Sequence, residues 1–399
     1  MEKNILELNE IAKQQGKKFK RKRFIYDKIK KSLNKKIFLA IIGPRGAGKT
    51  VLLKQFCNLL ENSFYISLDS ILLDRPLFEI CKELEQTGIK YLFIDEIHFL
   101  NNFQKELKKI YDFLNIQIIF TGSVSIPLYR SAYDLSRRVK VFHLYPFSFD
   151  EFLFFKDKKV QKFVFSDFSD LIKSKKYYGK ILQFESLFEE YLKGALFPFT
   201  LDSMVDNSIF LNILNTVLRK DLIQSGEVDL SEIEEIQKTL KFIGFSPAED
   251  INYSSISSNV GITKYKAEKY VLLLEKAFLL NVVMPKGTNI KKEPKILLNL
   301  PYRLLYKSFE QCIGDLREDF FVELSKMYGL DLRYLKSLRG EKTPDYFLPK
   351  QDIVFEIGGK GKSINQFKGF NSKKKLILTH PGRISEFYRP LFMYGMLEM

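Results

Sequence analysis

The octapeptide GPRGAGKT, from Gly43 to Thr50, constrains this chain of 399 residues more than any other segment. It satisfies the pattern G-x-x-x-x-G-K-[ST] at every position. The apolar run IFLAII precedes it over residues 37–42, and VLLKQF follows it over residues 51–56 with the character of a helix. A buried strand, a glycine-rich loop and a helix N-terminus together present backbone N–H groups to phosphate. The segment therefore predicts a nucleotide-binding phosphate loop.

Each residue type in this loop has a chemical task. Backbone N–H groups bind the β-phosphate, Lys49 places a positive charge at the β- and γ-phosphates, and the Thr50 hydroxyl reaches Mg²⁺. We expect ATP and Mg²⁺ as cofactors. The expected contacts to the nucleotide are Gly43, Pro44, Arg45, Gly46, Ala47, Gly48, Lys49, Thr50 and Val51.

A second apolar segment ends in two carboxylates. The run KYLFIDE over residues 90–96 is apolar until Asp95 and Glu96. Asp95 is placed to hold Mg²⁺, and Glu96 to activate the water that attacks the γ-phosphate. Two adjacent acids could also form a solvated turn, but their position about 45 residues after the loop favours a catalytic pair. A water-activating Glu indicates a hydrolase that uses ATP as a switch or motor.

Strand-like and helix-like segments alternate between residues 37 and 150, which predicts an α/β fold with a parallel sheet. The expected strands are residues 37–42, 64–68, 91–95, 117–121 and 139–144.

Several polar residues follow the fourth of these strands. Thr121 or Ser123 at its tip could sense the γ-phosphate or could belong to an ordinary turn. Further on, Arg130, Arg137 or Arg138 could be a finger that completes a neighbour's site, and each could equally be structural.

The composition excludes several classes of protein. No apolar run is long enough to cross a membrane, and the N-terminus shows no apolar signal region. Three widely spaced cysteines argue against a disulfide framework or a zinc site and favour the cytoplasm. The net charge of +16, dense over residues 17–36, favours double-stranded DNA as a partner. The alternative explanation is that the many lysines reflect an AT-rich or thermophilic genome.

The region from residue 236 to residue 300 has the pattern of a winged helix. A short helix over residues 253–260 and a turn at 261–263 would lead into a second helix. Its exposed side would carry Lys264, Tyr265, Lys266, Lys269 and Tyr270, and a wing between two strands would carry Lys291 and Lys292. Such a module fits a DNA major groove and the adjacent phosphates. The alternative is a module that only packs or docks a protein.

Two expected strands near the C-terminus carry acids. Asp345 and Glu356 could hold a divalent metal for phosphodiester hydrolysis, and Glu318 or Glu323 on a helix around residues 313–327 could add a third ligand.

Restriction-type nucleases place a lysine two residues after this Glu. Here that position is Gly358, and Lys360 comes four residues after Glu356. Lys360 could reach back to the acids, or it could only contact phosphate.

Several segments together resemble the archaeal and bacterial AAA-type ATPases of the prokaryotic ATP-binding-protein group. They are GPRGAGKT (43–50), YISLD (65–69), FIDEIH (93–98), FTGS (120–123), LSRRV (135–139), LYPFSFDEF (144–152), EEYLKGALFP (189–198) and EIGGKGK (356–362). These proteins combine an AAA core with a winged helix and a restriction-endonuclease-like domain of unknown function. The resemblance implies ATP-site roles for Lys49, Thr50, Asp95 and Glu96. It also aligns Arg138 with the usual arginine, although Arg137 replaces the small residue normally found before it.

We therefore expect an α/β P-loop NTPase of the AAA+ type with further modules. These are a basic helical arm (1–36), the ATPase core (37–150), a helical lid (151–205), a winged helix (206–305) and an α/β endonuclease-like domain (306–399). The expected function is an ATP-hydrolysing, DNA-associated switch or motor. The alternatives are an ATP-dependent regulator that docks a protein partner and an ATP-gated, metal-dependent DNA nuclease. The sequence leaves open whether the protein forms a homo-oligomer.

Overall fold

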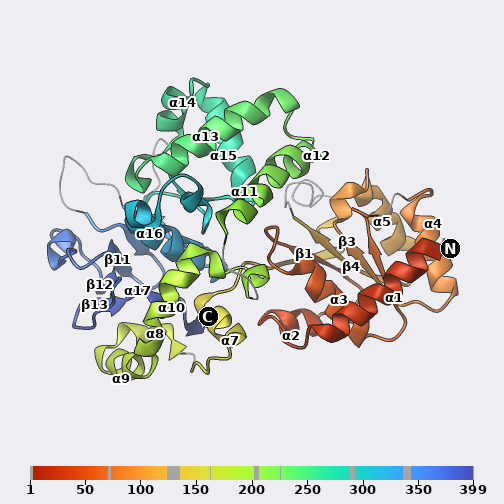
Figure 1. Ribbon diagram of the computed structural model, residues 1–399, viewed down its shortest axis with the longest axis horizontal. Helices are drawn as coiled ribbons and strands as arrows, with labels where there is room; N and C mark the ends of the chain where they lie inside the picture. The colour runs from red at the N-terminus through yellow and green to blue at the C-terminus, as the bar shows by residue number, and fades with distance from the viewer. Residues whose placement is uncertain are drawn as a thin grey trace. The chain divides into compact units, whose positions relative to one another are not determined.

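The computed structural model describes residues 3–70, 73–123, 135–161, 163–201, 206–224, 226–287, 293–335 and 343–398. The chain forms two compact units, drawn in Figure 1. The first unit contains residues 1–146 and 216–229, and the second contains residues 147–215 and 230–399. The first unit thus includes a short segment from much further along the sequence.

Within the described residues, the first unit contains a sheet of five parallel strands in the order β2-β3-β4-β1-β5. Its elements are α1 (Lys3–Lys18), α2 (Tyr26–Lys30), β1 (Phe38–Ile42), α3 (Lys49–Leu59), β2 (Ser63–Ser67), α4 (Leu77–Gln86), β3 (Tyr91–Asp95), α5 (Phe103–Phe113), β4 (Gln117–Gly122), β5 (Val139–His143) and α12 (Leu222–Gln224). The parallel α/β sheet expected from the sequence is confirmed.

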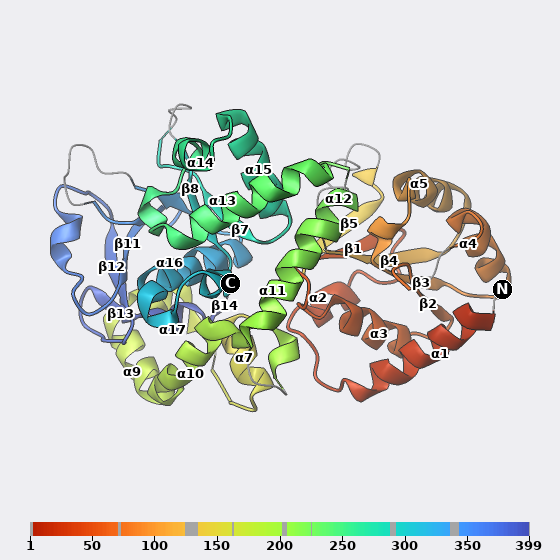
Figure 2. The same cartoon turned by 45° about the horizontal axis from the view of Figure 1, so that its top comes forward.

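Helices cover both faces of this sheet, which explains why β1 is apolar throughout. Phe38, Ala40 and Ile42 pack with side chains of α4 and α5, whereas Leu39 and Ile41 pack with side chains of α2 and α3. Figure 2 shows α1 and α3 along one face and α4 and α5 along the other. Alternate residues of a strand point to opposite faces, so a sheet buried on both sides requires a continuous apolar run.

The basic N-terminal segment packs on this sheet. α1 approaches α3 so closely that a Cβ on Gly16 would lie 2.2 Å from the carbonyl oxygen of Lys54. Arg23 is buried, and its Nη1 donates a hydrogen bond to the carbonyl oxygen of Ala47 at 2.5 Å. Part of the positive charge that favoured DNA therefore supports the phosphate loop.

The second unit combines helices with a mixed sheet in the order β13-β12-β11-β10-β9. Strands β9, β10 and β11 are antiparallel neighbours, while β11, β12 and β13 are parallel. The unit contains α7 (Phe149–Phe155), β6 (Phe163–Val164), α8 (Phe165–Ser169), α9 (Leu171–Ile181), α10 (Glu185–Glu190), α11 (Asn207–Thr216, whose last residue belongs to the first unit), α13 (Ile233–Phe245), α14 (Tyr253–Val260), α15 (Lys264–Lys276), β7 (Leu280–Val283), β8 (Lys295–Leu298), α16 (Phe309–Met327), β9 (Arg333–Tyr334), β10 (Tyr346–Leu348), β11 (Ile353–Gly358), β12 (Lys374–Thr379), β13 (Tyr388–Pro390), α17 (Leu391–Tyr394) and β14 (Leu397–Glu398).

Helices α14 and α15 and the antiparallel pair β7–β8 occur where the sequence placed two helices and two strands. Asn252 caps α14 through a capping box with Ser255, and Gly261 ends that helix with a φ of 76°. A left-handed residue at this position suits glycine because it has no Cβ to clash. Tyr270 was expected on the exposed side of α15, and this is wrong because its side chain is buried.

Candidate functional site

The strand order brings three loops of the first unit to one edge of the sheet. β4 lies between β1 and β3. The phosphate loop follows β1, Asp95 ends β3, and Ser123 follows β4. Because neighbouring parallel strands end at the same edge, residues far apart in sequence meet there.

The phosphate loop has the backbone shape that its glycines allow. Gly46 and Gly48 have φ values of 83° and 92°, a region that L side chains rarely adopt. A Cβ on Gly43 would lie 2.0 Å from the carbonyl oxygen of Leu144, so the loop can pass close to the chain after β5 only with glycine here.

The helix that follows the loop begins where its free N–H groups can bind a phosphate. α3 begins at Lys49, with Thr50 and Val51 in its first turn. N–H groups in a first turn have no partner within the helix and attract anions. The Nζ atom of Lys49 donates hydrogen bonds to the carbonyl oxygens of Gly43 and Pro44 at 2.8 and 3.0 Å. The donors of the loop and of this lysine fit a nucleotide phosphate chain.

Asp95 is held by two hydroxyl groups. Its Oδ2 accepts a hydrogen bond from Tyr65 at 2.9 Å, and its Oδ1 accepts one from Thr121 Oγ1. Thr121 Oγ1 also accepts a hydrogen bond from the backbone N–H of Glu96 at 2.9 Å. Thr121, one of the two expected phosphate sensors, thus fixes both acids of the pair.

Glu96 combines unusual backbone geometry with burial. Its φ of 53° is left-handed, which is uncommon for a residue with a side chain and typical of functional sites. Its Oε2 atom is buried and has no hydrogen bond with any described residue. His98 Nδ1 is 3.3 Å away, but no hydrogen bond forms. Burial raises the pKa of Glu96, although the positive charge of Lys49 opposes this shift.

The neighbouring His98 is uncharged at neutral pH. Burial lowers its pKa to about 4, although the charge of Asp221 opposes this shift. A buried carboxylate oxygen without a partner, beside a neutral imidazole, fits a group that receives a water or a ligand.

Asp221 is a residue of this site that the sequence did not indicate. It lies at the end of a π-helical turn, Val217–Asp221, and its side chain is fully buried. Its carboxylate accepts two hydrogen bonds from Arg45, at 2.8 and 2.6 Å, and one from Ser123 at 2.9 Å. Arg45 and Ser123, both expected at the nucleotide, are therefore joined through one carboxylate. No local motif in the segment around Asp221 could have predicted this.

Arg138, a candidate finger for a neighbour's site, lies away from the phosphate loop of its own chain. Arg138 precedes β5, and its carbonyl oxygen accepts a hydrogen bond from Phe38 N at the start of β1. That is the opposite edge of the sheet from the phosphate loop. Its guanidinium pairs with Asp112 at 2.9 Å. The exposed Arg137 directly precedes it, and Arg130 lies outside the described residues.

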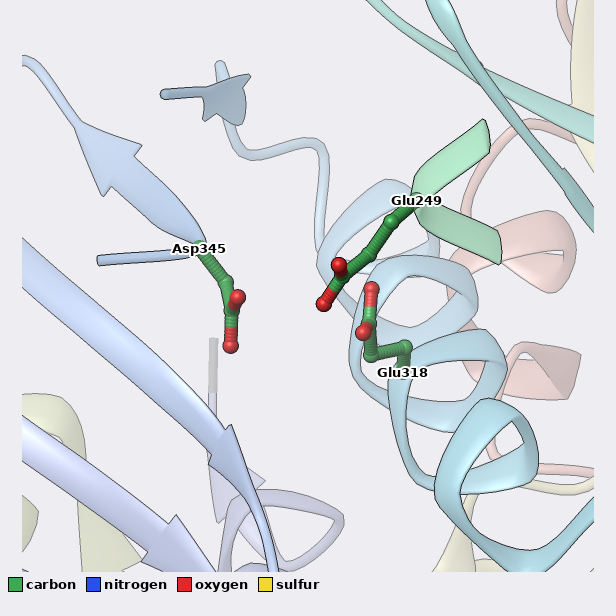
Figure 3. Close-up of side chains that lie close together, drawn as sticks. All are labelled: Glu249, Glu318 and Asp345. Atoms are coloured by element: carbon green, nitrogen blue, oxygen red, sulfur yellow. The ribbon is translucent and has the colours of Figure 1, made fainter. Parts of the chain in front are cut away.

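A separate group of acids lies in the second unit (Figure 3). Carboxylate oxygens of Glu249, Glu318 and Asp345 all lie within 4.8 Å of one another. Glu318 accepts hydrogen bonds from Lys295 at 2.5 Å and from Tyr346 at 2.8 Å. Burial, together with the charge of Glu318, raises the pKa of Asp345 to about 8. Such a group of carboxylates can bind a hard divalent cation.

The structure changes the expected set of ligands. Glu323 accepts a hydrogen bond from Leu300 N at 2.8 Å, so Glu318 is the helix acid that joins Asp345. Glu356 is buried on the neighbouring strand, where its Oε1 pairs with Lys362 at 2.5 Å. Glu356 is not among the three acids that converge. The lysine that reaches back is Lys362 rather than Lys360, because the turn after β11 returns the chain toward Glu356.

The lysines expected to face DNA are ion-paired within the second unit. Lys264 pairs with Glu293, Lys266 with Glu235 at 2.8 Å, and Lys269 with Glu232 at 2.8 Å. The face is therefore less positive than the sequence suggested. Lys291 and Lys292 lie outside the described residues.

Comparisons with known proteins match the part of the chain that carries the first of these sites. Residues 35–153 match a family model described as an AAA domain, and residues 185–299 match a domain of unknown function, DUF8612. The protein MJ1637 of Methanocaldococcus jannaschii is 30% identical over 392 residues, covering 87% of this chain and 82% of that protein. The chain belongs to the same family as MJ1637. It carries an AAA-type P-loop ATPase domain, as the resemblance implied.

Two further matches are more distant. An uncharacterized protein of Haemophilus influenzae is 28% identical over 353 residues, covering 80% of this chain and 82% of that protein. The Walker-type ATPase PABY2304 of Pyrococcus abyssi matches with a TM-score of 0.37 and 17% identity, over 68% of this chain and 91% of that one. Within the described residues of this chain, no helix is long and apolar enough to span a bilayer.

Proposed function

We propose that this protein hydrolyses ATP at the site formed by the phosphate loop, Asp95 and Glu96. The observation that carries the proposal is the buried Oε2 of Glu96, which no described residue satisfies, at the edge of a complete phosphate loop. Thr50 and Asp95 would hold Mg²⁺, which would offset the negative charge of the phosphates.

The residues of the chain then divide the chemistry between them. Lys49 and the N–H groups of the loop stabilise the charge that develops on the phosphates. Glu96 orients and deprotonates the attacking water. Its raised pKa brings its basicity closer to neutral pH, where a general base is most effective. Thr121 keeps Asp95 and Glu96 in register.

We further propose that ATP turnover is coupled to double-stranded DNA. The net charge of +16 and the arrangement of α14, α15, β7 and β8 support this. Because Lys264, Lys266 and Lys269 are paired with carboxylates, DNA phosphates would have to compete for them. Each should therefore contribute less than a free lysine.

Double-stranded DNA should bind the full-length protein with an affinity that falls as salt rises. The slope of log K against log salt should be about −0.9 for each phosphate contacted. Replacing Lys264, Lys266 and Lys269 together with alanine should make this slope shallower by up to about three. Fluorescence anisotropy at several salt concentrations measures it.

A triple alanine variant of Lys105, Lys108 and Lys109 on α5 is the matched control and should keep the slope. An equal change of the salt slope in the two triple variants would argue that no specific face of the protein binds DNA. Absence of salt-dependent binding would favour the alternative, a regulator that docks a protein partner.

The acidic group in the second unit supports a second candidate function, metal-dependent hydrolysis of phosphodiesters. Glu249, Glu318 and Asp345 would hold the metal, and Lys362 would lie near the scissile phosphate. Glu249 precedes α14, outside the segment that was expected to carry a nuclease site.

In nucleotide-free protein, Mn²⁺ should bind at this group, and Asp345→Asn should weaken that binding at least about 10- to 100-fold, the usual cost of losing even an outer-shell partner. Electron paramagnetic resonance of free Mn²⁺ measures the affinity, and nicking of a plasmid measures the activity. Asp352→Asn, in the turn between β10 and β11, makes the same substitution as a control. If Asp345→Asn and Asp352→Asn bind Mn²⁺ with equal affinity, the three acids do not form the metal site.

A further inference from the structure

Asp221 occupies an unusual place in the nucleotide site. Its carboxylate binds a side chain of the phosphate loop and a side chain at the tip of β4, the two segments that meet the end of the phosphate chain in the proposed ATPase. Arg45 contributes Nε and Nη2, and Ser123 contributes its hydroxyl. His98 Nε2 lies 4.0 Å away. One buried acid therefore binds two groups, and lies near a third, that could each donate a hydrogen bond to phosphate.

A carboxylate and a phosphate compete for donors of this kind. The planar fork of an arginine binds either anion through two parallel hydrogen bonds. Two anions close together in a buried site also repel each other more strongly than they would in water. ATP presents one more charged phosphate to this edge of the sheet than ADP does. Arg45 and Ser123 can donate their hydrogen bonds to Asp221 or to that phosphate, but they cannot fully satisfy both.

The place of Asp221 in the chain gives this competition a consequence. The segment 216–229 belongs to the first unit, while the residues before it and after it, 147–215 and 230–399, belong to the second. Asp221 ends a π-helical turn, a local departure from α-helix that is frequent at functional sites. Lys220 adds one more contact of this segment, with its Nζ 4.5 Å from the centre of the Phe99 ring.

We propose that Asp221 is a positioning residue, whose carboxylate holds Arg45 and Ser123 in the absence of ATP. When ATP binds, its γ-phosphate displaces this carboxylate from the two side chains. Displacement loosens segment 216–229, so the chain that enters and leaves it carries the nucleotide state to the second unit. ADP, which lacks the γ-phosphate, leaves the contacts of Asp221 in place. This inference rests on the proposed nucleotide site, and it adds how the bound nucleotide would be coupled to the second unit.

Hydrogen exchange of the wild-type, full-length protein tests this without any substitution. With Mg²⁺ and a non-hydrolysable ATP analogue, amides of residues 217–224 should exchange about 5- to 150-fold faster than with Mg²⁺ and ADP, the usual range of coupling between two sites. Binding of both nucleotides is measured separately with a fluorescent competitor. If both bind and the exchange rates are the same, the inference fails and the proposed site stands. If neither nucleotide binds, the proposed site fails and the inference falls with it.

Asp221→Asn gives a second, independent measurement. This variant keeps the shape of the side chain and removes its charge, so residues 217–224 should exchange fast with either nucleotide. Its preference for the ATP analogue over ADP should rise by a similar factor, because the phosphate no longer displaces a charged partner. Asp229→Asn, an exposed position in the same segment, should behave as the wild type. A purely structural role for Asp221 would weaken the two nucleotides equally, and that result would overturn the inference.

Discussion

Glu96→Gln should lower the rate of ATP turnover by about 10²- to 10⁴-fold, the usual contribution of a positioned general base. Glutamine matches the shape of glutamate but cannot take a proton from water. The left-handed backbone at residue 96 and the hydrogen bond from its N–H to Thr121 should persist, because neither depends on the carboxylate. Affinity for ATP should therefore change little.

Phosphate release and fluorescent-nucleotide binding separate the two effects. Glu61→Gln, an exposed substitution of the same kind in the turn before β2, should leave both unchanged. The wild-type rate should also fall as the pH drops, with a midpoint above the ordinary pKa of glutamate, because burial raises the pKa of Glu96 and the protonated form is inactive. A Glu96→Gln variant that keeps its rate would place the base elsewhere.

Lys49→Ala should remove most ATP binding as well as turnover. The side chain of Lys49 brings a positive charge to the loop, where it donates hydrogen bonds to the carbonyl oxygens of Gly43 and Pro44. Loss of a single preorganised donor at a developing charge costs about 10²- to 10³-fold in rate. Because the alanine variant also leaves two loop carbonyls without their donor, we expect at least this loss.

Lys54→Ala is the matched control, since Lys54 lies on the same helix α3 and its Nζ donates to Gln15 rather than to the loop. Its affinity for ATP and its turnover should stay near those of the wild type. Equal losses in the two variants would indicate damage to α3 rather than to the nucleotide site.

The parts of the structure that could be predicted are those encoded locally. The backbone of the phosphate loop requires glycine at positions 46 and 48, and the strand before it is apolar because both of its faces are buried. The eight residues of the loop and their neighbours are therefore enough to predict this part of the structure. The same holds for α14, whose bounds match the prediction because Asn252 and Gly261 cap it.

Contacts between distant segments could not be predicted in this way. Asp221 meets Arg45 across 176 residues of sequence, and Glu249 meets Asp345 although no spacing rule relates them. Sequence spacing alone suggested Lys360 as the partner of Glu356, whereas the turn after β11 delivers Lys362.

Phosphate release from ATP by the full-length protein, with Mg²⁺ and with or without double-stranded DNA, tests the central claim most directly. The account predicts turnover that DNA stimulates and that Glu96→Gln and Lys49→Ala each lower by about 10²-fold or more. Turnover near the wild-type rate in both variants would show that the phosphate loop and Glu96 do not form the hydrolytic site, and this would contradict the account.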